Sequence, residues 1–133
     1  MTTLYVDSSA LLKRVFIEAE SSAVRSLLRQ SNAAGDLLTA SSLAWLEVWL
    51  ALRRSGIANV SSVVPRALAG IAEFPLSDSV LARARQAGGD ALRTLDAVHL
   101  ASAVAVGADT VLTYDERLAE SAAAAGIAVL APS

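Results

Sequence analysis

Two kinds of segment alternate along the chain. Short apolar runs bounded by polar or turn residues are typical of buried strands, and they occur at Leu4–Val6, Leu37–Thr39, Thr110–Thr113 and Ile127–Leu130. Longer segments with apolar residues at helical spacing separate them. These predict helices from Ser8 or Ser9 to Phe16, over Glu18–Gln30, from Ser41 or Ser42 to Arg54, over Val60–Glu73, from Ser77 or Asp78 to Gln86, over Leu95–Val106 and from Asp115 to Ala125.

Short apolar strands that alternate with helices indicate an α/β protein with a parallel sheet covered on both faces. Phe74–Leu76 is predicted to be a short extended piece, Gly88-Gly89 a helix break, and Thr94 the cap of the helix that follows. No linker, repeat or low-complexity segment divides the chain. We therefore expect residues 1–133 to form a single domain.

Composition narrows the possible functions. The hydrophobic fraction of 54% excludes disorder, and the lack of cysteine excludes disulfides and thiolate chemistry. The most apolar stretch, Leu37–Leu52, is too short to span a membrane and contains Glu47, and the N-terminus does not resemble a signal peptide. We expect a soluble, cytoplasmic protein. The formal net charge of −2 by itself argues against a nucleic-acid binder.

Four acidic residues lie in apolar surroundings. Asp7 and Asp115 follow predicted strands, and Asp96 lies in the first turn of a predicted helix, so all three can approach the carboxyl edge of the sheet, where α/β proteins bind ligands. Each of the three also has a simpler role, as a helix cap or as a charge that favours the helix dipole. Glu47 lies within an apolar helix, where it caps nothing and needs a partner.

Carboxylates that converge raise one another's pKa unless a cation lies between them. A hard divalent ion with oxygen ligands, Mg²⁺ or Mn²⁺, is the simplest such cation. It would activate a water molecule and neutralise charge on a phosphoryl group. Whether one or two ions bind stays open.

Four blocks of sequence together resemble the PIN-domain family, and most of all the VapC-type toxins of bacterial toxin–antitoxin pairs. They are YVDSSALLKR, the glutamate in SSLAWLEVWLAL, LDAVHLASA and TYDERLAESA, and they run in family order across nearly the whole chain. The resemblance implies a PIN-like, flavodoxin-like three-layer sandwich with a short parallel sheet flanked by helices. It also implies a Mg²⁺- or Mn²⁺-dependent endoribonuclease that forms a homodimer and is inhibited by a small cognate antitoxin.

The resemblance also assigns the site. The family's acidic positions correspond to Asp7, Glu47, Asp96 and Asp115, which are expected to be both catalytic residues and metal ligands, with Glu47 binding the ion directly or through water. Ser8 and Thr113 match polar positions beside the site.

Other residues carry weaker signals. His99 is expected to be a hydrogen-bonded packing residue, although contact with the substrate stays open. Trp45 and Trp49 are one turn apart, which favours packing in the core or in a dimer interface. The basic residues considered for phosphate contacts, or for ordinary solvated helix faces, are Lys13, Arg14, Arg53, Arg54, Arg83, Arg85 and Arg93.

Other functions leave different marks in a sequence. A haloacid-dehalogenase-like phosphohydrolase needs Asp-x-Asp after the first strand, where this chain has Asp7-Ser8-Ser9. A response-regulator receiver needs an acidic pair and a late lysine, whereas the only lysine is Lys13. A non-catalytic PIN-like binding module stays possible. Without the four proposed ligands, nine acidic side chains remain against 11 basic ones, so the net charge no longer opposes binding of RNA.

Overall fold

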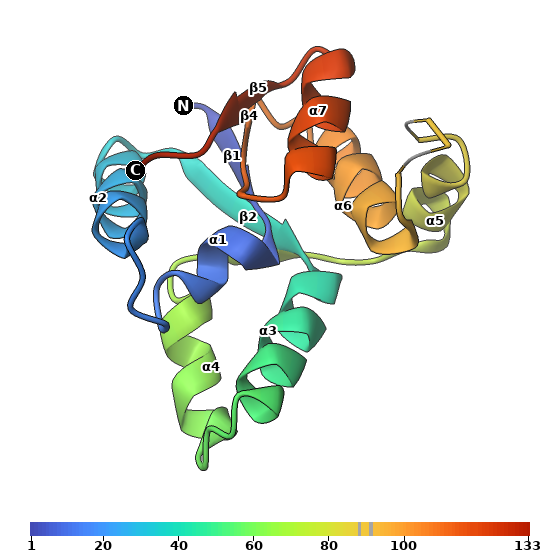
Figure 1. The fold of residues 1–133 in the computed structure, drawn as a ribbon. Coiled ribbons are helices and arrows are strands. Elements are labelled where there is room, and N and C mark those ends of the chain that lie inside the picture. Colours follow the sequence, from blue (N-terminus) through green and yellow to red (C-terminus); the bar gives the residue numbers. More distant parts are fainter. Residues whose placement is uncertain (88, 91) are drawn as a thin grey trace.

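The computed structural model describes residues 1–87, 89–90 and 92–133 and has a parallel sheet with helices on both sides (Figure 1). The sheet has five strands in the order β3-β2-β1-β4-β5, and every neighbouring pair is parallel. The strands are β1 (Thr3–Val6), β2 (Leu37–Ser41), β3 (Ala72–Phe74), β4 (Thr110–Leu112) and β5 (Ala128–Leu130). This arrangement confirms the predicted α/β class.

Helices connect the strands as the sequence pattern predicts, although several of their ends differ. They are α1 (Ser8–Leu12), α2 (Ser21–Ala33), α3 (Ser42–Arg54), α4 (Val60–Leu68), α5 (Asp78–Ala84), α6 (Thr94–Ala105) and α7 (Glu116–Ala124). In the described residues, no helix is both long enough and apolar enough to cross a membrane.

Two hydrophobic cores lie on opposite faces of the sheet. Leu4 and Val6 of β1 join the larger core with apolar residues of α1, α2, α3 and α4. Tyr5 joins the smaller core with residues of α6 and α7. Because successive side chains of a strand point to opposite faces, this division follows from the all-apolar run of β1.

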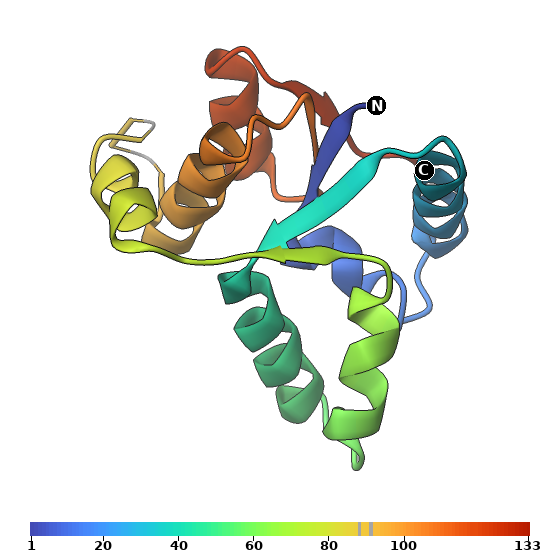
Figure 2. The same cartoon turned by 180° about the vertical axis from the view of Figure 1, so that it is seen from behind.

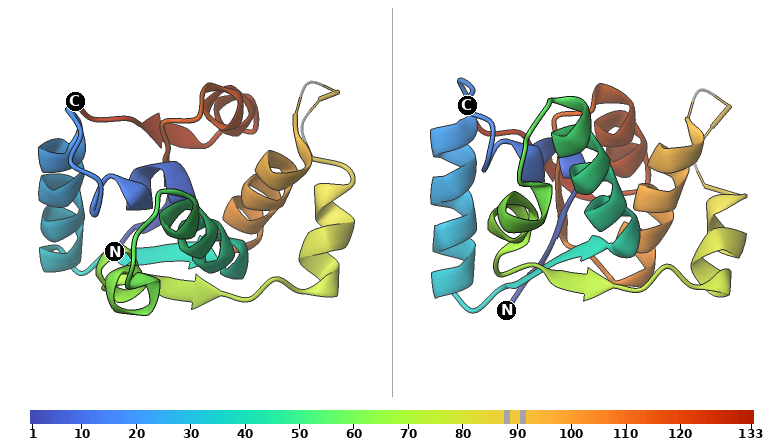
Figure 3. Two further views of the ribbon diagram at one scale, coloured as in Figure 1. Left: turned by 60° about the horizontal axis from the view of Figure 1, so that its bottom comes forward. Right: turned by 90° about the horizontal axis from the view of Figure 1, so that it is seen from below.

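The helices also reach beyond the sheet. α3 and α4 pack against each other and project together away from it, and β3 leads from this pair to α5 (Figure 2). α2 and α5 lie at opposite ends of the molecule (Figure 3). At the carboxyl edge of the sheet, β1, β2 and β4 are followed by α1, α3 and α7, and this edge carries the predicted site.

The predicted helix from Ser8 to Phe16 is too long, because α1 ends at Leu12. The chain then tightens into three-residue turns, in which the backbone N–H groups of Arg14 and Val15 donate to Leu11 and Leu12. The next helix begins at Ser21 rather than at Glu18. The Ser21 hydroxyl donates to the carbonyl of Phe16 and accepts from the backbone N–H of Glu18, which holds the connection outside the helix.

The predicted helix Val60–Glu73 is wrong in its second half. α4 ends at Leu68, and Gly70 has a φ of +77°, a conformation that favours glycine and ends the helix. Ala72–Phe74 then pairs with β2 as the edge strand, slightly earlier than the predicted extended piece Phe74–Leu76.

The two helix starts nearest the site need separate comment. Asp115 caps α7 as predicted, but Arg93 rather than Thr94 occupies the capping position of α6, without a side-chain hydrogen bond. α5 ends at Ala84, two residues before the predicted end. The predicted break at Gly88-Gly89 involves Gly88, which lies outside the described residues.

Candidate functional site

Asp7 lies at the carboxyl end of β1 and is almost fully buried, with 4% of its surface exposed. Its Oδ1 accepts hydrogen bonds from the Ser9 hydroxyl (2.6 Å) and from the backbone N–H of Ala10 (3.2 Å), so it caps α1. Its Oδ2 accepts from the Thr113 hydroxyl (2.8 Å). Burial raises the pKa of Asp7, while the hydrogen bonds and the nearby His99 oppose that rise.

Thr113 joins two of the predicted site residues. While its buried hydroxyl donates to Asp7, the same oxygen accepts from the backbone N–H of Asp115 (3.0 Å). Ser9 makes a second connection, since its oxygen accepts from the backbone N–H of Tyr114 (2.9 Å). The role expected for Ser8 falls to Ser9: among the hydrogen bonds of the described residues, none joins Ser8 to Asp7.

Glu47, Asp96 and Asp115 line one cleft of about 380 Å³ at the same edge of the sheet. They come from three elements, α3, the first turn of α6 and the cap of α7, and Arg93, Thr94 and Leu95 complete the lining. Asp115 serves two purposes, because its Oδ1 also accepts from the backbone N–H groups of Arg117 and Leu118. The structure thus brings three of the predicted acids into one cleft. The fourth, Asp7, is linked to the cleft residue Asp115 through the hydrogen bonds of Thr113.

The charges in this cleft are unbalanced. Burial raises the pKa of Asp96, and the negative charges of Asp115 and Glu47 raise it further, while His99 and Arg117 lower it. The carboxylates therefore repel one another as they stand.

His99 anchors Glu47. The ring is buried, its Nε2 lies 2.5 Å from Oε1 of Glu47, and its Nδ1 lies 2.7 Å from the hydroxyl of Tyr5. That hydroxyl accepts from the backbone N–H of Ser41 (3.2 Å) and, since burial raises the pKa of Tyr5, keeps its proton. In the neutral ring, Tyr5 therefore donates to Nδ1 and Nε2 donates to Glu47.

The same contacts shift the ionisation of His99. Burial disfavours the protonated ring, but the hydrogen bond and the charge of Glu47, together with the charges of Asp7 and Asp96, outweigh it and raise the pKa of His99. Of the two roles considered for His99, its 2% exposure and its two side-chain partners fit the hydrogen-bonded packing residue.

The side chains around the cleft suit a hard divalent cation in kind. Carboxylate oxygens are the ligands that Mg²⁺ and Mn²⁺ take in proteins, and the repulsion that raises the pKa of Asp96 is what such an ion relieves. Across the described residues, however, no three histidine or acidic side chains form a ready-made metal cluster.

Sequence reasoning missed part of this arrangement. The hydrogen bonds of Tyr5 and Ser9 to site residues depend on side-chain direction; the only sequence signals are that Tyr5 and Ser9 each lie two residues from Asp7. Trp45 packs against the larger core, and Trp49 is 39% exposed. Both line an apolar groove between α3 and α4.

We predict that Thr113→Val lowers the free energy of unfolding by about 1–3 kcal/mol, because it leaves a buried carboxylate oxygen of Asp7 without its donor. Thr110→Val, at the start of the strand β4 that leads to Thr113 and without a side-chain hydrogen bond in the described structure, is the matched control and should change stability little. Urea denaturation measures both. Equal effects of the two changes would mean that the Thr113 hydroxyl does not support Asp7.

Comparison with known proteins agrees with this geometry. The profile of the PIN domain matches residues 4–124. Three ribonucleases of Mycobacterium tuberculosis are similar over nearly the whole length of both chains. VapC46 is 38% identical with full coverage of both chains, VapC35 is 34% identical and VapC47 is 30% identical, each of the last two covering 97% of this chain and 96% of the relative.

Solved structures share the fold at low identity. M. tuberculosis VapC20, described as a sarcin–ricin loop cleaving toxin, superposes with a TM-score of 0.73 at 17% identity, covering 97% of this chain and 99% of that one. VapBC2 from Rickettsia felis, bound to a DNA fragment from its promoter, gives 0.75 at 12% identity, covering 99% and 100%. The chain therefore belongs to the PIN-domain family and is homologous over its full length to the VapC ribonucleases.

Proposed function

We propose that this protein is a Mg²⁺- or Mn²⁺-dependent endoribonuclease, the toxin of a type II toxin–antitoxin pair, which hydrolyses RNA phosphodiesters at the acidic cleft. One observation carries the proposal: Glu47, Asp96 and Asp115 come from three separate elements to one cleft beside the buried Asp7. The full-length relatives named ribonucleases support the choice of RNA.

Asp7, Asp96 and Asp115 would hold the ion directly, and Glu47 directly or through water. When bound, the ion lowers the pKa of a water molecule and neutralises charge that develops on the phosphoryl group. Thr113 and Ser9 keep the Asp7 carboxylate in one orientation through their hydrogen bonds. This support counts because partners behind metal ligands fix the geometry of the site.

Glu47 is suited to handle the proton. Glu47 lines the cleft, and its Oε1 forms a hydrogen bond with His99. In the described structure its Oε2 forms no hydrogen bond. That oxygen can orient the attacking water and accept its proton. Arg93, which lines the cleft beside Asp96 and Asp115, supplies positive charge for the phosphate of the substrate.

The proposed partners follow from the same assignment. A small cognate antitoxin would restrain the nuclease, as the structural likeness to VapBC2 of Rickettsia felis suggests. We further propose that the protein works in the cytoplasm as a homodimer, for which the apolar groove beside Trp45 and Trp49 offers packing surface.

The nuclease assay uses purified protein freed of antitoxin and a mixture of cellular RNAs. We expect cleavage with Mg²⁺ or Mn²⁺, none with a chelator, and a loss of at least about 100-fold for Asp7→Asn, because removal of a ligand should exceed the roughly 10–100-fold effect of outer partners. Asp78→Asn, an exposed acid of α5, should keep full activity. Growth of cells that express the protein measures its toxicity. If neither ion supports cleavage and Asp7→Asn leaves this toxicity unchanged, the assignment as an enzyme is wrong.

We also predict that Asp96→Asn raises the melting temperature of the metal-free protein. The folded-state pKa of Asp96 is raised, so its charged form weakens the fold as the pH rises through that pKa, and asparagine removes the charge. Added Mg²⁺ should then stabilise the wild-type protein more than the variant.

Asp78→Asn is again the control, because Asp78 also lies in the first turn of a helix but at an exposed position. There the helix dipole favours the charge, and the change should lower the melting temperature slightly. A metal-free Asp96→Asn variant that melts below the wild type would contradict the predicted repulsion.

A further inference from the structure

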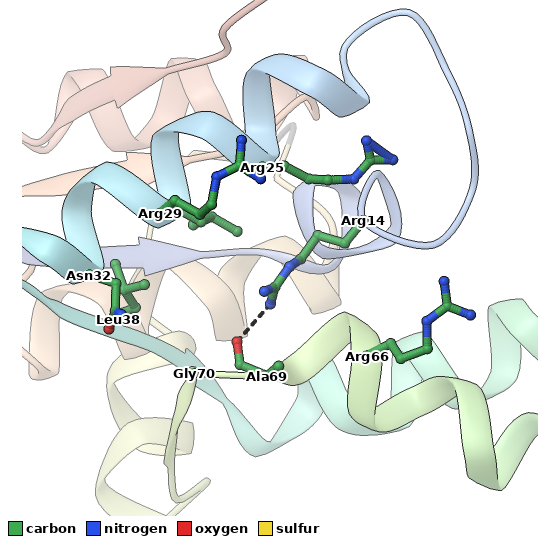
Figure 4. Close-up of a pocket in the computed structure, with 9 residues that line it drawn as sticks. Arg14, Arg25, Arg29, Asn32, Leu38, Arg66, Ala69 and Gly70 are labelled. Atoms are coloured by element: carbon green, nitrogen blue, oxygen red, sulfur yellow. Dashed lines mark hydrogen bonds between the residues drawn. The ribbon is translucent and has the colours of Figure 1, made fainter.

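A second hollow, the arginine pocket, lies between α2 and α4 on the face of the larger core. It has a volume of about 440 Å³ and is lined by four of the chain's ten arginines, Arg14, Arg25, Arg29 and Arg66. Figure 4 shows Arg25 and Arg29 on α2, Arg66 on α4, and Arg14, which follows α1, between the two helices. Leu28 and Leu38 belong to its apolar lining.

The charge of this pocket is unbalanced. No acidic residue is among the described residues that line it, and none of its arginines joins an ion pair in the described structure. Lys13, next to Arg14, differs in that it pairs with Glu18 and Glu20. The four arginines therefore give the lining of one pocket a positive charge that no acid in the described lining offsets.

Arg14 is held in position for this role. Its Nη1 donates to the carbonyls of Ala67 (2.9 Å) and Ala69 (2.8 Å), one of which is drawn in Figure 4. Burial lowers the pKa of Arg14, although a guanidinium stays charged. A desolvated cation held only by neutral carbonyls still attracts an anion. The N–H groups at Nε and Nη2 have no hydrogen-bond partner in the described structure.

The spacing of the arginines suits several phosphates in a row. Arginine binds phosphate through paired hydrogen bonds, and Arg25 and Arg29 are one turn apart on α2, at about 5–6 Å between their Cβ atoms. A single phosphate engages two or three such groups, whereas this pocket supplies four from three segments. A strand with repeated phosphates uses all of them.

The position of the pocket relates it to the acidic cleft. Asp7 caps α1, and Arg14 follows the end of that helix by two residues, so this short helix connects the buried acid of the site with one wall of the pocket. The cleft has three carboxylates and one arginine, Arg93, among its lining residues, so positive charge outside it helps to hold an RNA strand.

We propose that the arginine pocket binds backbone phosphates of the RNA strand that the acidic cleft cleaves, and so acts as a second substrate-binding site. The proposal rests on the proposed function for the identity of the strand. Its physical basis, four arginines free of ion pairs around one hollow, is independent of the metal chemistry.

The test measures binding rather than cleavage. Arg25→Gln with Arg29→Gln is compared with Arg53→Gln with Arg54→Gln, which removes the same charge from exposed residues at the end of α3, outside the pocket. The probe is a fluorescent single-stranded RNA, titrated by anisotropy with a chelator present. We expect at least about tenfold weaker RNA binding for the first pair. The slope of log K against log salt concentration should become shallower by about 1.4, because two phosphate contacts are lost at about 0.7 each.

Equal loss of RNA binding in the two pairs would overturn the proposal. A second result would also overturn it: the Arg25→Gln, Arg29→Gln variant binds fluorescent poly-glutamate more weakly than the wild type but binds RNA equally well. The pocket would then be a site for an acidic polypeptide. Thermal melting checks that both variants fold. The two proposals can fail separately. If only the first pair weakens RNA binding but the wild-type protein does not cleave RNA with Mg²⁺, the proposed nuclease is refuted and the phosphate-binding pocket is supported.

Discussion

Negative charge gathered at one edge of a parallel sheet is the constraint on which the rest of this structure depends. Parallel strands end at the same edge, so residues that follow β1 and β4 meet there even though more than 100 positions separate them in sequence. Asp7 is buried at that edge and stays in place because Ser9, Ala10 and Thr113 donate hydrogen bonds to it. Without these donors its burial would cost several kcal/mol.

Different parts of the fold position the four carboxylates at this edge. The first turns of α1 and α7 donate backbone N–H groups to Asp7 and Asp115. His99 forms hydrogen bonds with both Glu47 and Tyr5, which positions Glu47. These contacts orient the carboxylates, but they leave Asp96 with a raised pKa because its acidic neighbours stay close. This remaining repulsion is what the divalent ion that we propose would relieve.

Positive charge also gathers outside the acidic cleft. The arginines of the pocket between α2 and α4 lie on the face of the larger core, and none of them lines the acidic cleft. A formal net charge of −2 conceals this separation, since it sums an acidic edge and a basic face. For a strand of RNA the local arrangement matters more than the sum, because phosphate contacts act over short, salt-screened distances.

Sequence patterns predicted the α/β class and the approach of Asp96 and Asp115 to one edge of the sheet, because strand ends and helix starts are local signals. Glu47 lies within α3, and only the resemblance to the PIN-domain family assigned it to the same site. They misplaced the end of α4, since Gly70 rather than the apolar period decides it. They chose Ser8 where Ser9 bonds Asp7, and they overlooked Arg25, Arg29 and Arg66. These contacts depend on side-chain direction and on distant segments that meet only in the fold.

The most direct test of the central claim is a crystal structure of the protein grown with Mn²⁺, with the ion located by its anomalous scattering. Our account predicts an anomalous peak in the acidic cleft, coordinated by oxygens of Asp7, Asp96 and Asp115, with Glu47 bound directly or through water. A cleft without such a peak at saturating Mn²⁺, or an ion bound only away from these four carboxylates, would contradict it.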